Sequence, residues 1–216
     1  VDLRKHGESK PAGAAKAAGK IGIRLKGVDY KLMVAMDLEA VKKFILSEHH
    51  KKKLNIRKTA IVAPEMSAPV AITFAWRDWL KRPHPDSPIL ATRTPRGQDI
   101  RAMVLLSPEA SVTGVSISKP LMGLRTPQWG VAFMIGYGTA DTLDKNGRSA
   151  TRIHKKLITN AENKPRMFLQ AYKTKLRGTD LLGSRLRVEE HILGFLRKYL
   201  KELPGEWTNR VSRLDD

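Results

Sequence analysis

The chain has 216 residues, enough for one or two domains, and hydrophobic residues make up 41% of it, which allows a packed core. It contains no cysteine, which excludes a disulfide scaffold, a thiolate zinc site and a cysteine nucleophile. Lys and Arg together number 40 against 21 Asp and Glu, which leaves a formal charge of +19. Because such self-repulsion calls for a polyanion to relieve it, we expect the partner to be nucleic acid, contacted mainly through phosphate.

The amino-terminal segment, residues 1–20, is rich in Gly, Ala and Lys and has no apolar face. It predicts an extended basic tail that orders only against nucleic acid. The chain begins at Val1, which fits either a cleaved targeting peptide or a trimmed start. No uncharged apolar stretch approaches the roughly 18–20 residues needed to span a bilayer, so we expect no membrane partner.

The next elements are a strand, a helix and a second strand. Ile21–Lys26 alternates apolar and polar residues, which indicates a strand. From Tyr30 to about Lys53, apolar residues recur at helical spacing, and the basic end of this segment suits a helix C-terminus. Ile56–Val62 then predicts a second strand.

Repeated prolines between residues 64 and 129 argue against long helices in that region. Short strands are predicted instead at Val70–Ala75, Ile100–Leu106 and Val112–Ser118, and another at Gly130–Tyr137. We therefore expect a β-rich region here.

The last third of the chain is predicted to contain a hairpin turn, two strands and two helices. Asn146-Gly147 is a hairpin turn signal before a strand at Ser149–Ile158. A helix over 165–176 opens on a proline, and Leu181–Val188 could be a last strand. A closing helix spans Val188–Leu203.

Two segments resemble the small-subunit ribosomal protein ten family. Ile21–Lys26 (IGIRLK), followed by Asp29, Leu32 and the basic triplet Val41-Lys42-Lys43, resembles the family's opening strand, turn and basic helix. Arg152–Ile158 (RIHKKLI) resembles its Arg-Thr-His-Lys-Arg-Leu-Ile strand. The matched parts cover under half of the chain, about 21–62 and 149–188, and large-subunit mitochondrial proteins share the implied fold.

The resemblance implies an α+β fold with a ferredoxin-like βαββαβ core, and the element order read from the residues agrees with it. The core would comprise 21–63 and 149–188. Residues 64–148 would form a large β-rich, Pro-containing insertion, and 189–216 a C-terminal helical extension. The insertion holds apolar side chains that exceed what short strands bury alone, so we expect it to contact neighbouring proteins: Trp76, Trp79, Leu105, Leu106, Leu121, Met122, Trp129 and Phe133.

Clusters of cations carry the predicted RNA contacts. Residues 42–58 hold seven cations and Glu48, which favours phosphate binding over a merely solvated helix face. A second cluster surrounds Arg152, where the predicted strand would carry cations on both faces. The predicted RNA-binding residues are Lys16, Lys20, Arg24, Lys42, Lys43, Lys51, Lys52, Lys53, Arg57, Lys58, Arg148, Arg152, His154, Lys155 and Lys156.

We find no catalytic constellation, metal site or cofactor motif, and no small-molecule substrate is expected. His49 and His50 lack a third ligand at a convincing spacing, and no nucleophile elbow or phosphate loop occurs. Trp76 and Trp79, interleaved with cations, could stack on bases or anchor a core.

The predicted function is therefore a structural constituent of the ribosome that binds and locks rRNA, in the small-subunit head of a mitochondrial ribosome. A free RNA-binding protein or RNA chaperone, a large-subunit protein of the same fold, and another organelle or the cytoplasm remain as alternatives.

Overall fold

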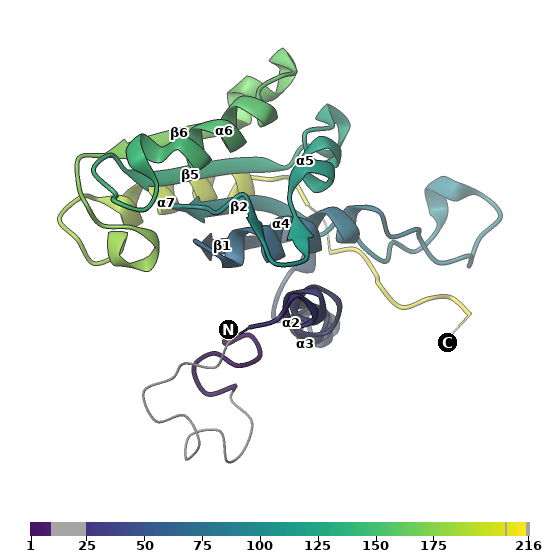
Figure 1. Cartoon of the computed structure of the whole chain (residues 1–216). Coiled ribbons are helices and arrows are strands. Elements are labelled where there is room, and N and C mark those ends of the chain that lie inside the picture. Colours follow the sequence, from purple (N-terminus) through teal and green to yellow (C-terminus); the bar gives the residue numbers. More distant parts are fainter. Residues whose placement is uncertain (10–24, 206, 215–216) are drawn as a thin grey trace.

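A four-stranded sheet with strand order β1-β2-β5-β6 forms the centre of the computed structural model, which describes residues 1–9, 25–205 and 207–214 (Figure 1). All neighbouring strands are parallel. Their order in the sheet follows their order in the chain, so each connection advances the sheet by one strand. The strands are β1 (Thr59–Pro64), β2 (Ile100–Leu106), β5 (Ala132–Gly138) and β6 (Met167–Tyr172).

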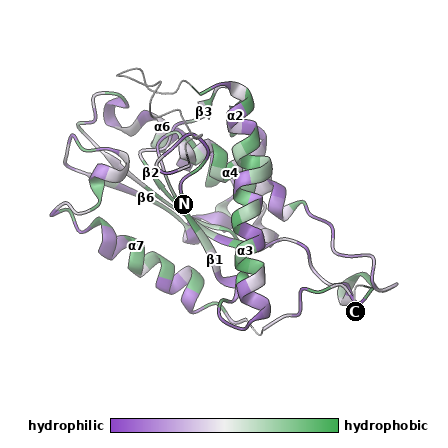
Figure 2. Ribbon diagram, turned by 90° about the horizontal axis from the view of Figure 1, so that it is seen from below, coloured by the Kyte–Doolittle hydropathy of each residue, from purple (hydrophilic) through white to green (hydrophobic). Residues whose placement is uncertain are grey.

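Helices cover both faces of this sheet. The connections supply α4 (Ser67–Trp79), α5 (Ser118–Leu124) and α6 (Arg148–Leu157), which pack into one hydrophobic cluster with one face of the strands. The other face packs against α7 (Val188–Leu196), which continues as a π-helical turn over Arg197–Lys201. Figure 2 shows α4 and α7 on opposite sides of the strands.

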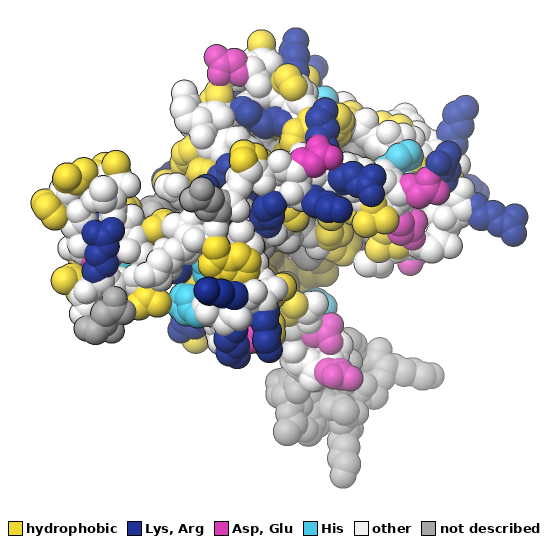
Figure 3. Space-filling view, turned by 180° about the vertical axis from the view of Figure 1, so that it is seen from behind, with side chains coloured by type: hydrophobic (Ala, Val, Ile, Leu, Met, Phe, Trp, Pro, Cys, Tyr) yellow, Lys and Arg dark blue, Asp and Glu magenta, His cyan; other side chains and the backbone are white. Residues whose placement is uncertain are grey.

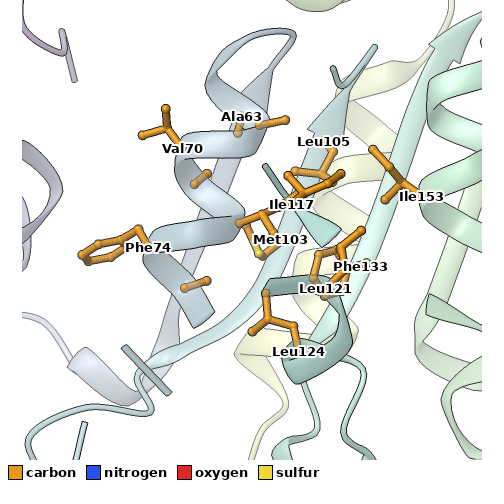
Figure 4. Close-up of a cluster of buried hydrophobic side chains, with 14 of the residues drawn as sticks. Ala63, Val70, Phe74, Met103, Leu105, Ile117, Leu121, Leu124, Phe133 and Ile153 are labelled. Atoms are coloured by element: carbon orange, nitrogen blue, oxygen red, sulfur yellow. The ribbon is translucent and has the colours of Figure 1, made fainter. Parts of the chain in front are cut away.

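The two central strands are buried on both faces because helices lie above and below them. Six of the seven residues of β2 and six of the seven of β5 are buried. Met103, Leu105 and Phe133 point into the α4–α5–α6 side of the core (Figure 4). Such strands appear in sequence as near-continuous apolar runs, as these two do.

A long N-terminal helical segment lies beyond the edge strand β1. It comprises α2 (Gly27–Leu32), a π-helical stretch (Met33–Asp37) and α3 (Leu38–His50). Met33 and Val34 are buried in the same cluster as α4, which attaches this segment to the sheet. The remaining elements are a β3–β4 hairpin (Ser111–Val112 and Val115–Ser116) and 3-10 turns at Ile56–Lys58, Leu90–Thr92, Pro127–Trp129, Lys145–Gly147, Ala161–Arg166 and Gly178–Leu181.

The expected ferredoxin-like βαββαβ core is not confirmed, and neither is the insertion. The segment Arg152–Ile158, predicted as a strand, belongs to α6 up to Leu157. Its apolar residues Ile153 and Leu157 are four apart and both buried, which is helical spacing that the strand interpretation overlooked. Residues 64–148, predicted as an excursion, supply the central strands β2 and β5.

Four further predictions are wrong, the first being the strand at Val112–Ser118, which is instead part of the β3–β4 hairpin and the first residue of α5. Val70–Ala75 lies inside the 13-residue helix α4, because Pro69 stands in the helix's first turn, where a missing N–H is harmless. Residues 165–176 form the end of a 3-10 turn and strand β6 instead of a helix. Leu181–Val188 is a loop that leads into α7 instead of a strand.

Other predicted elements are confirmed. Ile100–Leu106 is β2 with the predicted bounds, and Gly130–Tyr137 corresponds to β5 shifted by two residues at its start. The helix over Tyr30–Lys53 is present from Gly27 to His50, with a π-helical stretch inside it. Asn146-Gly147 is a turn with both residues at positive φ, but it precedes a helix.

The basic tail and the first strand can be followed only in part. Residues 10–24 lie outside the described residues, so the predicted strand Ile21–Lys26 cannot be followed beyond its last two residues, which precede α2 without being strand. The first residues contact the N-terminal helical segment through ion pairs of Arg4 with Asp37 and Lys5 with Asp29. This part of the tail packs on the protein itself.

Most of the apolar side chains that led us to expect protein contacts at residues 64–148 pack inside the chain. Trp79, Leu105, Leu106, Leu121 and Phe133 are buried in the chain's own core, whereas Trp76 and Trp129 are half-buried and Met122 is 63% exposed. Contact of this region with neighbouring proteins therefore stays a prediction.

Candidate functional site

Lys42, predicted to bind RNA, is buried instead. Its ammonium group pairs with Asp78 and lies 2.7 Å from Oδ2 of Asp99. Both carboxylates are buried, and Asp99 also pairs with the buried guanidinium of Arg210. This buried network fastens α3 and the C-terminal segment to the start of β2. Lys42 is therefore a structural residue.

The other cations of the 42–58 cluster remain at the surface around the end of α3. Lys43, Lys51, Lys52, Lys53 and Arg57 are exposed. Glu48 partly neutralises this group, because Lys51 pairs with it at 2.8 Å and Lys53 at 3.8 Å. Nζ of Lys58 donates to the carbonyl of Lys201 at 2.8 Å.

The second predicted cluster is a stripe on α6. Arg148, Arg152 and Lys156 are exposed at four-residue intervals, with Lys155 beside them, so they share the outward face of the helix. The prediction that these cations lie on the two faces of a strand is wrong. They are nevertheless exposed on the helix. His154 instead lies against β6, where its Nε2 is 3.2 Å from the carbonyl of Met167.

The predicted contacts are not gathered into one patch. Figure 3 shows Lys and Arg side chains spread over the face that it displays. Lys16, Lys20 and Arg24 lie outside the described residues.

A basic pocket of about 670 Å³ lies near the amino ends of the strands, between the loop after α4 and the C-terminal segment. Its lining has no Asp or Glu and contains the cations Arg57, Lys81, Arg93, Arg96, Arg101, Arg210 and Arg213. Lys81 pairs with Glu39 at 2.7 Å, and Arg210 pairs with Asp99. The other five cations are arginines, and none of them forms an ion pair with a described residue.

Arg101 is the most constrained of these five. It is the second residue of β2, and its guanidinium lies 5.2 Å from the ring centre of Trp79, an attractive cation–π contact. Burial lowers the pKa of Arg101, and the charge of nearby Arg57 lowers it further. An anion placed here would relieve that repulsion.

Three of the remaining arginines are held by neutral partners, the first being Arg57, whose Nη1 donates to Oγ1 of Thr208 at 3.1 Å. Nε of Arg93 donates to the carbonyl of Ser87 at 2.7 Å, and Nη2 of Arg213 donates to the carbonyl of Thr92 at 3.2 Å. A guanidinium has five N–H donors, so each keeps further donors for a ligand. The pocket can therefore offer several charge-assisted hydrogen bonds to phosphate or carboxylate oxygens.

Asp86 ties the two walls of this pocket together. Its carboxylate accepts from the amide of Thr94 at 3.0 Å and from the amide of Arg213 at 3.2 Å. Hydrogen bonds, that of the Thr94 side chain foremost, lower the pKa of Asp86 from 3.8 to about 2. The carboxylate thus stabilises this contact fully above pH 3.8, and the contribution is lost as the pH falls through about 2.

We therefore expect the amide resonances of Thr94 and Arg213 to titrate together in acid, with a midpoint of about 2. NMR spectra recorded over this pH range measure the midpoint, and Asp86→Asn should abolish the titration. A midpoint at 3.8 for both amides would show that Asp86 makes no such contact.

A second cluster of charges, which sequence reasoning missed, lies at the carboxyl ends of the strands. Glu65 directly follows β1, Asp141 follows β5 and Arg177 follows β6. Nε of Arg177 lies 2.6 Å from Oε1 of Glu65 and 3.7 Å from Oδ2 of Asp141. Gly178 lies beneath Glu65, since a Cβ there would approach Cδ of Glu65 to 2.7 Å. In parallel sheets, ligands bind at this edge.

The turn that carries Glu65 is strained. Its φ is +44°, and Ser107, after β2, has a φ of +47°. Non-glycine residues in this region cost free energy and concentrate at functional sites. A sharp turn from strand to helix presents the serine nucleophile in α/β-hydrolases. Here the strained turn between β1 and α4 holds a glutamate, and Arg177 from the loop after β6 pairs with it. No pattern in the sequence alone marks Glu65 as such a position.

Of the two adjacent histidines, His50 is exposed, whereas His49 has a structural role. His49 is buried, its ring is stacked on Trp207 with centroids 4.8 Å apart, and its Nε2 lies 2.8 Å from the carbonyl of Thr208. Within the part of the chain that the structure describes, no group of three or more Asp, Glu or His residues is placed to hold a metal ion. Trp79 stacks on Trp129 inside the core, which leaves its ring unable to stack on bases.

None of the described helices has the length and apolar character required to cross a bilayer. In the comparisons with known proteins, no family model and no curated sequence matches this chain.

Proposed function

We propose that this protein binds RNA through its phosphates and that the basic pocket is the main contact. The observation that carries the proposal is a pocket lining with seven cations and no carboxylate, in a chain with a charge of +19. Phosphate contacts of this kind dominate the affinity of RNA-binding proteins and need no base recognition. The pocket concentrates unpaired guanidinium groups, whereas the α6 stripe presents its cations on a convex helix surface.

The proposal predicts a strong dependence of RNA affinity on salt. Each phosphate contact to a single strand contributes about 0.7 to the slope of log affinity against log salt concentration. Replacing Arg96, Arg101 and Arg213 together by Gln should lower this slope by about 2, since three contacts are lost. The measurement is the affinity for a single-stranded RNA of about ten nucleotides at salt concentrations from about 50 to about 200 mM.

The matched control removes the same charge elsewhere. A variant with Arg148, Arg152 and Lys156 replaced by Gln has the same net charge as the pocket variant, and all three side chains are exposed. It should retain most of the slope. Equal losses in both variants would mean that net charge alone attracts RNA and that the pocket has no special role.

A narrower proposal is that the RNA is rRNA and that the protein is a constituent of the small subunit of a mitochondrial ribosome. Its support is the distributed positive charge. The family resemblance adds no support, because the segment Arg152–Ile158 is helical up to Leu157 and the sheet is parallel. Sedimentation in salt separates this proposal from a free RNA-binding protein or chaperone: a ribosomal protein stays with the large particle, whereas a free binder leaves it early. Under either proposal the role is binding rather than catalysis.

A further inference from the structure

Glu65 lines a second cavity, which shares no lining residue with the basic pocket. This cavity, of about 620 Å³, runs along the edge strand β1, between the N-terminal helical segment and α4. Its wall is mostly apolar and includes Met33, Met66, Val70 and Phe74. Figure 4 shows Val70 and Phe74 on the side of α4 that faces away from β2. The volume suits a small organic molecule.

Besides Glu65, the cavity lining holds the ionisable residues Asp2 and His6. Lys42 and Asp99 also reach the lining, but they pair with each other in the buried network. Glu65 is 38% exposed, and Arg177 is its one ion-pair partner among the described residues. The lining holds three carboxylates, Asp2, Glu65 and Asp99, against two cations, the ammonium of Lys42 and the α-amino group of Val1, which gives a formal charge of −1. The cavity therefore combines an apolar wall with a carboxylate, Glu65, at its end beside the carboxyl end of β1.

The fold holds this end in place. The amide of Glu65 donates to the carbonyl of Leu106 at 2.9 Å, and the carbonyl of Glu65 accepts from the amide of Ala68 at 3.1 Å. These bonds fix the strained turn between β1 and α4. Thr179, in the turn after Arg177, also lines the cavity. Arg177, the ion-pair partner of Glu65, does not line the cavity, and a carboxylate has acceptor sites for more than one donor, so Glu65 can receive a further hydrogen-bond donor from the cavity.

We propose that this cavity binds an elongated apolar molecule that ends in an amine, with the ammonium group on Glu65 and the apolar body along β1. The strained turn places Glu65 in the lining of this cavity. This site lies at the carboxyl edge of the sheet and is separate from the basic pocket, so it can be tested independently of RNA binding.

The overall charge of the protein makes the test stringent. A chain with a charge of +19 attracts organic anions and repels organic cations over most of its surface. Decylamine and decanoate have the same apolar length and opposite charge. A preference for decylamine can therefore arise only at a site whose local charge opposes the net charge.

The experiment measures the dissociation constants of both probes by titration calorimetry, at concentrations where neither forms micelles. Decylamine should bind at least about tenfold more tightly than decanoate. In NMR spectra, the methyl signals of Met33 and Met66, which line the cavity, should shift on addition of decylamine. Those of Met36 and Met122, which are 57% and 63% exposed, should not.

Matched variants locate the preference. Glu65→Gln should remove it, whereas Glu65→Asp, which keeps the charge, should preserve it. Glu162→Gln removes one carboxylate from an exposed position just before β6, at the opposite edge of the sheet, and should leave both dissociation constants unchanged. RNA affinity should stay the same in all three variants.

Tighter binding of decanoate, a preference that persists in Glu65→Gln, or unshifted Met33 and Met66 signals would each overturn the proposal. The wild-type methyl signals decide the matter even where a variant folds poorly.

Discussion

Lys42→Met should lower the free energy of unfolding by about 3–5 kcal/mol. The substitution removes the ammonium group from between Asp78 and Asp99, whose side chains are 0% and 2% exposed. Two buried carboxylates would then share only the cations Arg210 and Lys81. Chemical denaturation monitored by circular dichroism measures the loss.

Lys43→Met is the matched control, because Lys43 is the exposed neighbour of Lys42 on α3. It should change stability by no more than about 0.5 kcal/mol.

Burial already raises the pKa of Asp99, against the opposing charges of Lys42 and Arg210, and losing Lys42 raises that pKa further. A carboxyl with a raised pKa favours folding in its protonated form, so the deficit of Lys42→Met should shrink as the pH falls. A stable Lys42→Met variant with weakened RNA binding would contradict the structural role.

Phe133→Ala should cost about 3–5 kcal/mol of stability. Phe133, the second residue of β5, is fully buried, and its ring lies among Met103, Leu121 and Leu124 (Figure 4). Truncation removes the buried ring and leaves a cavity that rigid neighbours cannot close. Phe44→Ala provides the comparison, since this phenylalanine is 63% exposed on α3. A similar denaturation midpoint for the two variants would show that β5 is not at the centre of the core.

The elements predicted correctly from the sequence are those whose burial produces a simple apolar pattern. The strands β2 and β5 were found because burial on both faces requires continuous apolar runs, and the long N-terminal helix was found because one of its faces is apolar. The segment Arg152–Ile158 was misread because its cations suggested two exposed strand faces, while the buried residues Ile153 and Leu157 are spaced for a helix. Prolines misled the prediction of α4, since Pro69 sits where a helix tolerates it.

The parallel sheet could not be derived from local patterns. Its architecture depends on which strands pair, and strand pairing joins residues far apart in the chain. A segment that reads as an isolated strand does not specify its partner or direction. Because strand pairing could not be derived, the expected topology came from the resemblance to a ribosomal family. The structure pairs its strands in the order β1-β2-β5-β6, which differs from that topology.

The candidate sites were likewise predicted only in part from the sequence. Composition predicted a polyanion partner, and exposed cations such as Arg57 and Lys156 lie where solvent or RNA can reach them. The sequence could not show that Lys42 is neutralised inside the protein, or that Arg101 joins four other unpaired arginines from distant segments. Likewise, Glu65, Asp141 and Arg177 meet only because three strands end at the same edge of the sheet.

NMR titration of the arginine side chains tests the central claim most directly. With a single-stranded RNA of about ten nucleotides added to the protein, the Nε–H signals of Arg96, Arg101 and Arg213 should shift first and furthest, since these groups lack carboxylate partners in the basic pocket. Arg210, paired with Asp99, should shift least among the arginines of this pocket. If instead Arg148 and Arg152 on α6 shift while Arg101 does not, RNA is bound by the surface stripe and the basic pocket is not its site.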